Sequence, residues 1–162
     1  MNIYLKLSDF KNDTKTIDLK DNIRYLYPKK NNIMEGEFTK ILFSKNNVTM
    51  NGVYLHLPLN TEKKITSNNE VFIRNIINTS SNSNIVYDLK ILEQCILNHY
   101  QAYNNIDKQM DTILSRQLST NQIRVYHDNS KHNIKRNFYV IKISGIWETS
   151  RKFGLTYKIM EL

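Results

Sequence analysis

The chain has 162 residues and a mass of 19.2 kDa, a length typical of one domain. It carries 23 basic and 15 acidic side chains, and its single cysteine, Cys95, excludes an internal disulfide. No apolar run is long enough to cross a bilayer, and the first residues lack the basic and apolar regions of a secretory signal. With a net charge of +8, we expect an intracellular protein with an anionic partner and no membrane contact.

The positive charge is concentrated near the C-terminus. Residues 1–84 carry a net charge of +4 and residues 85–121 a net charge of −1. Residues 122–162 contain eight basic and three acidic side chains, a net charge of +5. The abundance of Asn, Ile, Lys and Tyr suggests AT-rich codons, which enrich lysine without any functional reason. Such a bias does not predict clustering, so the position of the charge is more informative than its sum.

Alternating apolar residues predict strands in the first half of the chain. The expected strands are residues 2–7, 38–44, 48–59 and 71–77, with a short strand or turn before Pro28. Lys45, Asn46 and Asn47 supply a turn. Within 48–59, alternation places Val53 on one side and Tyr54 on the other. Asn51-Gly52 lies either inside this strand or in a tight hairpin turn that divides it.

Helical spacing begins after Asn84. One apolar stripe is formed by Ile85, Leu89, Leu92, Ile96, Tyr100 and Tyr103. Ser83 or Asn84 is the expected N-cap. A second helix is expected over 106–118, either separated from the first by Asn104-Asn105 or continuous with it.

The remaining sequence returns to strands, at 122–127, 138–148 and 155–160, with a basic loop at 128–137. Gly154 is expected to close a turn over 150–154 with a positive φ. The order of strands, helical insertion (about 85–118) and strands predicts one α+β domain over residues 1–162. An antiparallel OB-like barrel fits this order, and other small barrels fit almost as well.

No motif of a known enzyme class is present. With only four glycines, a glycine-rich phosphate loop is excluded in practice. The carboxylate pairs Asp107/Asp111 and Asp88/Glu93 are expected on solvated helix faces. Cys95 and His99 are four residues apart, but two ligands do not make a metal site, and a half-buried structural cysteine is expected. We therefore expect no catalytic residue, no metal and no cofactor.

Cations and aromatic residues alternate in the last quarter of the chain. Single-stranded nucleic acid needs both, since cations neutralise phosphates and aromatic rings stack on bases. The candidate nucleic-acid-binding residues are Arg124, Tyr126, Lys135, Arg136, Tyr139, Lys142, Trp147, Arg151, Lys152, Phe153, Tyr157 and Lys158. If the last two strands pair, Lys142 and Lys158 share one open face. The alternative is that the aromatic residues fill the core and the cations only solvate its rim.

Residues 142–159 read KISGIWETSRKFGLTYKI. This segment resembles the C-terminal signature of a family of small proteins from large nucleocytoplasmic DNA viruses, in which K-I-S-G-I-W-E precedes G-L-T-Y-K. Residues 51–59 (NGVYLHLPL) and 89–100 are similar to the middle of that family. The resemblance implies an OB-fold single-stranded DNA-binding protein. It also implies a location at viral replication sites in the host cytoplasm or nucleus, or in the virion.

Within this motif, Gly145 is expected at a bulge or a close backbone approach, and Glu148 is expected to pair with Lys152 or Arg151. The leading hypothesis is a non-catalytic, sequence-tolerant protein that binds single-stranded DNA (or RNA) in viral replication, recombination or transcription, with self-association open. The alternative is a virion structural or assembly protein that uses the barrel and the helical hairpin for protein contacts. A nuclease would require a carboxylate cluster.

Overall fold

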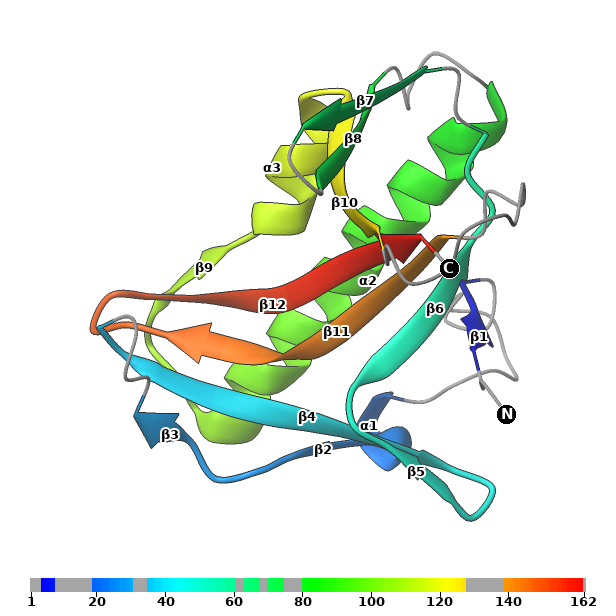
Figure 1. Cartoon of the computed structure of the whole chain (residues 1–162). Coiled ribbons are helices and arrows are strands. Elements are labelled where there is room, and N and C mark those ends of the chain that lie inside the picture. Colours follow the sequence, from blue (N-terminus) through cyan, green and yellow to red (C-terminus); the bar gives the residue numbers. More distant parts are fainter. Residues whose placement is uncertain are drawn as a thin grey trace.

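The computed structural model describes residues 4–7, 19–30, 35–60, 63–67, 70–74, 80–127 and 139–161. Its centre is an antiparallel hairpin of two long strands, β11 (Tyr139–Glu148) and β12 (Lys152–Glu161) (Figure 1). Ile141 lies opposite Ile159 and Lys142 opposite Lys158. Because alternate residues of a strand point to opposite faces, this register separates an apolar face from a basic one.

The sheet extends from this hairpin in both directions, in the order β1-β6-β11-β12-β10-β8-β7. These outer strands are β1 (Leu5–Lys6), β6 (Val53–Leu57), β10 (Gln122–His127), β8 (Glu70–Arg74) and β7 (Lys63–Ser67). One edge of β11 pairs with β6 along its first half and with β4 (Glu37–Lys45) along its second half. β4 also carries β2 (Ile23–Tyr25), β3 (Lys29–Lys30) and β5 (Val48–Met50), and β9 (Gln109–Asp111) pairs with β12.

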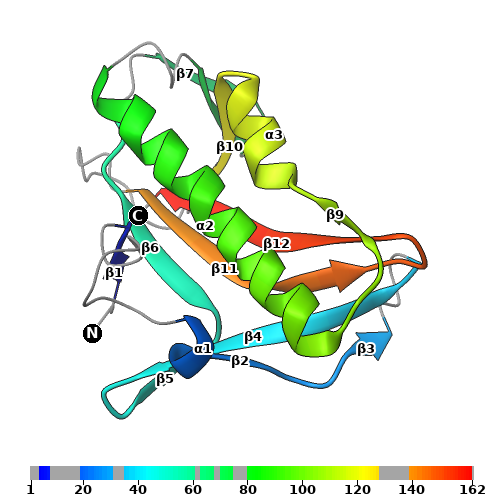
Figure 2. The same cartoon turned by 180° about the vertical axis from the view of Figure 1, so that it is seen from behind.

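Helix α2 (Ser80–Asn104) crosses one face of the sheet, with α3 (Ile113–Ser119) beside it (Figure 2). A short helix, α1 (Leu19–Asn22), precedes β2. Leu89, Leu92, Ile96 and Tyr100 of the predicted stripe are buried. They pack in one core with the inward residues of β6, β11 and β12. In the described part of the chain, no helix covers the opposite face of the sheet, and no helix is long and apolar enough to span a membrane.

The α+β prediction is confirmed, whereas the described strands form an open sheet that does not close into a barrel. The turn at Asn46-Asn47 is confirmed, since both residues have a positive φ, as a two-residue hairpin turn requires. Of the two alternatives at Asn104-Asn105, the structure shows the break: α2 ends at Asn104, and Asn105 has a φ of 49°.

Three local predictions are wrong. α2 begins at Ser80, so neither Ser83 nor Asn84 is its N-cap. The expected second helix over 106–118 is strand β9 followed by the shorter α3, because residues 109–111 pair with β12. Gly154 lies inside β12 rather than in a turn, and the residues between the two strands are 149–151.

Asn51-Gly52 divides two strands without forming a hairpin. β5 continues the hairpin with β4, whereas β6 pairs with β1 and β11, so the chain leaves one partner and joins another at this point. Gly52 has a φ of +109°, and a Cβ at this position would lie 2.5 Å from the carbonyl oxygen of Ile143. Glycine is therefore required here both by the backbone conformation and by the close approach of β11.

Gly145 follows a β-bulge, as predicted. The register between β11 and β12 shifts between Ile143 and Gly145. A Cβ on Gly145 would lie 2.3 Å from the carbonyl oxygen of Thr39 and 2.6 Å from the ring of Phe38. The bulge adds one residue to β11 and so reverses which of the later side chains of this strand face the core.

Glu93 is buried, which corrects the expectation of a solvated helix face. Its carboxylate accepts hydrogen bonds from the backbone N–H groups of Leu114 (2.9 Å) and Ser115 (2.7 Å) and from the Ser115 hydroxyl (2.5 Å). These N–H groups belong to the first turn of α3, where the backbone N–H groups have no acceptor within the helix. One side chain of α2 thus fixes the start of α3.

Glu93→Gln is expected to lower the free energy of unfolding by about 1.5–3 kcal/mol, because it replaces an ionised acceptor of buried N–H groups by a neutral one. Urea denaturation measures the change as a shift in midpoint at constant m-value. Asn98→Ala, an exposed position on the same helix, is the control and should shift stability by no more than about 0.5 kcal/mol. Equal effects of the two variants would contradict the role of Glu93.

Candidate nucleic-acid interface

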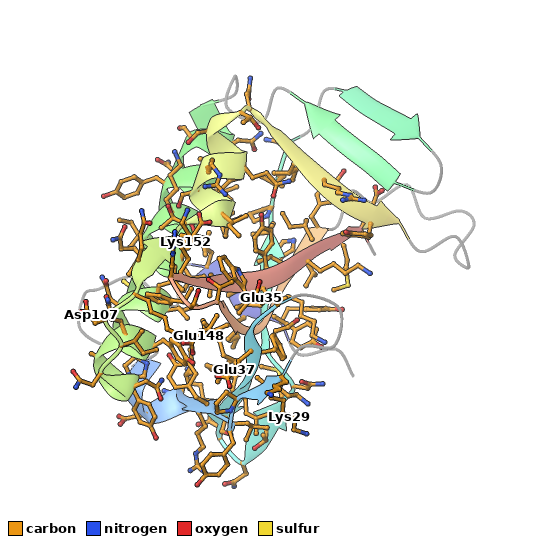
Figure 3. All side chains as sticks on the ribbon, turned by 90° about the vertical axis from the view of Figure 1, so that its left-hand side faces the viewer. Lys29, Glu35, Glu37, Asp107, Glu148 and Lys152 are labelled. Carbon is orange, nitrogen blue, oxygen red and sulfur yellow. The ribbon has the colours of Figure 1, made fainter. Side chains whose placement is uncertain are left out.

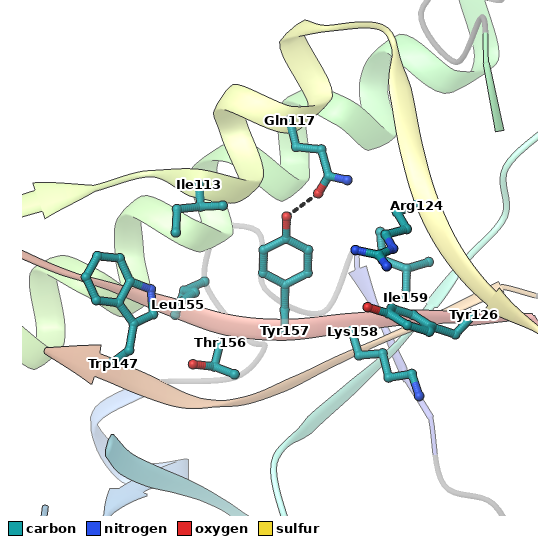
Figure 4. A pocket seen from close by; sticks show the side chains of 10 residues that line it. All are labelled: Ile113, Gln117, Arg124, Tyr126, Trp147, Leu155, Thr156, Tyr157, Lys158 and Ile159. Carbon is teal, nitrogen blue, oxygen red and sulfur yellow. Dashed lines mark hydrogen bonds between the residues drawn. The ribbon is translucent and has the colours of Figure 1, made fainter. Parts of the chain in front are cut away.

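A cleft of about 380 Å³ opens between β12, β10 and α3 (Figure 4). β12 pairs with β9 through residues 152–154 and with β10 only through Met160 and Glu161. Among the described residues, no strand covers the intervening part of this edge. The cleft is lined by Ile113, Gln117, Arg124, Tyr126, Trp147, Leu155, Thr156, Tyr157, Lys158 and Ile159.

Two cations lie against the ring of Tyr126 at one end of the cleft (Figure 4). The Nζ atom of Lys158 is 4.3 Å from the ring centroid, and the Cζ atom of Arg124 is 5.4 Å from it. Cation–π attraction at these distances holds both exposed side chains close to one aromatic ring. Positive charge and an aromatic ring are therefore offered to a ligand at the same place.

Lys142 extends this positive region onto the outer face of the sheet. It lies directly opposite Lys158 across β11 and β12, and its Nζ atom is 5.2 Å from the ring centroid of Tyr54 on β6. Like charges in this position repel each other. Among the described residues neither lysine forms an ion pair with a carboxylate. An anion bound between them would relieve the repulsion.

Trp147 forms the other end of the cleft and is half-buried. It lies opposite Gly154, where a Cβ would come within 2.8 Å of the indole, so glycine makes room for this ring. Between the two ends, Tyr157 points toward α3 and its hydroxyl donates a hydrogen bond to Oε1 of Gln117. Burial of the phenol, together with the nearby Glu93 carboxylate, raises the pKa of Tyr157 to about 12.

The structure brings five of the predicted site residues into one cleft: Arg124, Tyr126, Trp147, Tyr157 and Lys158. Lys142 lies beside them on the outer face. Arg151, between β11 and β12, and Lys152, the first residue of β12, are exposed and are not among the residues that line this cleft. Lys135 and Arg136 lie outside the described residues.

Two predicted stacking residues are corrected. Tyr139 and Phe153 are both 0% exposed and belong to the core, so neither ring presents a face to a base. Each points inward because it shares a face with residues that pack under α2: Tyr139 pairs with Leu57, and Phe153 pairs with Glu148. Glu148 is also corrected, since it binds Lys108 and Tyr100 rather than Lys152 or Arg151.

Gln117 and Thr156 line the cleft, although the sequence does not predict either as a site residue. Gln117 belongs to the segment expected to be helical from residue 106, whereas α3 begins at Ile113. The predicted apolar face of this segment, with Leu114 and Leu118, is buried as expected, but a neutral polar side chain such as Gln117 carries no signal of binding. Thr156 alternates correctly along β12, but a small neutral side chain carries no signal of binding in the sequence.

Other residues considered for catalysis or metal binding are partly buried or are held in contacts within the fold. Burial raises the pKa of the Cys95 thiol, which disfavours the thiolate that metals and electrophiles require. Nδ1 of His99 lies 2.9 Å from the Tyr25 hydroxyl. Asp111 forms an ion pair with Arg116 at 2.9 Å. In the described residues, no three His, Cys, Asp or Glu side chains are placed to hold a metal ion.

No family model matches the chain, and neither the curated proteins nor the solved structures include a significant match.

The Tyr157→Phe variant is expected to lose less stability than the wild-type protein as the pH is raised into the alkaline range. The phenol ionises near its ordinary pKa of 10.0 when unfolded but near 12 when folded. Its contribution is therefore fully present below pH 10.0 and is lost as the pH rises toward 12. Urea midpoints measured through this range should fall less steeply in the variant. Parallel curves for the two proteins would show that Tyr157 does not titrate in this way.

Proposed function

We propose that this protein is a non-catalytic, sequence-tolerant single-stranded DNA-binding protein. The binding surface is the cleft beside β12 together with the adjacent outer face that carries Lys142 and Tyr54. The observation that supports it most directly is the opposed pair Lys142 and Lys158, each held against a tyrosine ring and neither paired with a carboxylate in the described chain.

The proposed role of each residue follows from the chemistry of its side chain. Lys142, Lys158 and Arg124 neutralise phosphates, which releases counterions and makes affinity depend on salt. Trp147 and Tyr126, which lie at the two ends of the cleft, are assigned to stacking on bases. Stacking contributes about 1–3 kcal/mol per base and does not depend on base identity. A single strand of DNA bound in this way is held without recognition of its base sequence.

The resemblance of residues 142–159 to a viral family supports the same function. That segment contains Lys142, Trp147, Tyr157 and Lys158, four of the residues at the proposed interface. The implied role is in viral DNA replication, recombination or transcription. The proposal depends on the cleft and the outer face, and a closed OB-type barrel is not needed for it.

A second candidate, a structural or assembly protein, is favoured by one feature of α2. Tyr87 is 64% exposed and Ile91 is 37% exposed, one turn apart on the side of the helix that faces away from the sheet. Apolar side chains exposed in this pattern suit contact with another protein. This candidate would show self-association, or a protein partner, without salt-sensitive binding of nucleic acid.

Lys142→Gln/Lys158→Gln is expected to weaken binding of oligo-dT and to lower its salt dependence. Losing two phosphate contacts should reduce the slope of log affinity against log salt by about 1.4 for a single strand. Stability should be unchanged or slightly higher, because the repulsion between the opposed lysines disappears. Fluorescence titration at several salt concentrations measures the slope, and thermal unfolding measures stability.

The matched control is Lys29→Gln/Lys30→Gln, which removes the same charge from two exposed lysines on β3. If net charge alone attracts the DNA, the two double variants will lose equal affinity. An unchanged salt slope in Lys142→Gln/Lys158→Gln would contradict the proposed phosphate contacts.

Trp147 is the only tryptophan, so its fluorescence reports on this cleft alone. Oligo-dT is expected to quench it on binding, because a base stacks on the indole. Tyr126→Leu should weaken affinity by about 5- to 150-fold, the equivalent of one stacked base, with little change in salt slope. Binding detected by another method without any change in tryptophan emission would place the DNA elsewhere.

A further inference from the structure

A second cavity, of about 350 Å³, lies at the C-terminal end of α2 and is separate from the nucleic-acid cleft. The segment that links β2 to β3 forms one wall, and Thr39 of β4 and Glu148 of β11 lie at its base. Four tyrosines line it: Tyr25, Tyr27, Tyr100 and Tyr103. We call this cavity the tyrosine pocket.

Tyr25 packs against two of the other tyrosines, Tyr100 and Tyr103, and part of the pocket's aromatic surface stays exposed. The ring centroid of Tyr25 is 4.9 Å from that of Tyr100, in an edge-on arrangement, and 5.6 Å from that of Tyr103. Tyr27 is 93% exposed and Tyr103 is 68% exposed. Large aromatic side chains are seldom left this exposed, and here both belong to the lining of one cavity.

The polar groups at the base of the pocket already bind one another. The Tyr100 hydroxyl donates to Oε1 of Glu148 and lies 3.0 Å from Oγ1 of Thr39, and Nζ of Lys108 lies 2.8 Å from Oε2 of Glu148. The side-chain amide of Asn104 donates to the backbone oxygen of Tyr100 at 3.2 Å. A ligand that needs several directional hydrogen bonds therefore finds few partners here.

Carboxylates and cations both lie near the base of the pocket. Figure 3 labels Glu35, Glu37, Asp107 and Glu148 together with Lys29 and Lys152, and Lys108 forms an ion pair with Glu148. Burial, then the hydrogen bond to Glu148, and also the charges of Glu148 and Glu37, raise the pKa of Tyr100. Carboxylates that disfavour a phenolate here also disfavour a phosphate, whereas they favour a cation.

We propose that the tyrosine pocket binds a methylated ammonium group, the cation of a trimethyllysine side chain or of a small choline-like molecule. Such a cation has no N–H to satisfy, so the occupied polar base is no obstacle. It gains instead from contact with the tyrosine rings that line the pocket, with Glu148 and its partner Lys108 beneath them. This site is distinct from the nucleic-acid cleft and does not depend on the function proposed for that cleft.

The test is titration of the full chain with tetramethylammonium, followed by NMR chemical shifts and calorimetry. Saturable binding is expected in the wild-type protein, weakened at least 10-fold by Tyr103→Ala or Tyr27→Ala. Both positions are exposed, so the fold should survive, and oligo-dT affinity should stay unchanged in both variants. A trimethyllysine peptide and choline are then compared, and the tighter ligand identifies the source of the cation.

The matched control is Tyr87→Ala, which removes a tyrosine of similar exposure from the same helix outside the pocket. Neopentane-type neutral isosteres of the cation, such as 3,3-dimethylbutanol, test whether charge matters. The proposal is overturned if the neutral isostere binds as well as the cation, if Tyr87→Ala weakens binding as much as Tyr103→Ala, or if no saturable binding occurs.

Discussion

The register of β11 against β12 is the constraint on which the other features of this protein depend. It places Ile141 opposite Ile159 beneath α2, and Lys142 opposite Lys158 on the outside. Because side chains alternate along a strand, a slip of one residue in either strand would turn its lysine toward the core and its isoleucine outward. The cost of that alternative fixes the register, and the register fixes the basic face. Core packing thus creates the surface proposed to bind nucleic acid.

The bulge at Ser144 sets the orientation of the last residues of β11. Without the extra residue, Trp147 would point to the core and Ile146 to the outside. With it, Ile146 is buried, and Trp147 lies at the end of the cleft. Glu148 then points inward to Tyr100 and Lys108. One irregularity of the backbone therefore places a residue in each of the two cavities, the indole in one and the carboxylate in the other.

Two buried carboxylates, Glu93 and Glu148, have different kinds of partner. The first stabilises the fold, and the second lies at a proposed binding site. Glu93 is satisfied by backbone N–H groups and a hydroxyl of α3, so its charge is used within the fold. Glu148 is bound by Lys108 and the Tyr100 hydroxyl at the base of the tyrosine pocket. On the outer face of the sheet, Lys142 and Lys158 oppose each other without acidic partners in the described chain. The two cavities therefore differ in chemistry: the carboxylate of one is already paired, whereas the opposed lysines beside the other are not.

Much of the local structure is predictable from the sequence alone. Alternation predicts β4, β6, β10 and the β11–β12 pair, and helical spacing predicts the core stripe of α2. Asparagine pairs indicate the turn at 46–47 and a possible helix end at 104–105, where the structure has positive φ angles. These signals are local, since they depend on residues two to four positions apart. The opposed placement of Lys142 and Lys158 is also predictable, because pairing of two adjacent strands is a short-range event. The clustering of charge indicates the part of the chain that supplies most residues of the proposed cleft.

Other features were decided only by tertiary structure. Tyr139 and Trp147 are both aromatic residues on one strand, and only packing under α2 and the bulge buries one and leaves the other in a cleft. Residues 109–111 lie in a segment with helical spacing, but they pair with an edge of β12 and therefore form a strand. The tyrosine pocket joins Tyr25, Tyr100 and Glu148, which are far apart in the chain. Side-chain alternation is a property of the chain itself, whereas burial and proximity are set by the partners that the fold brings to each face.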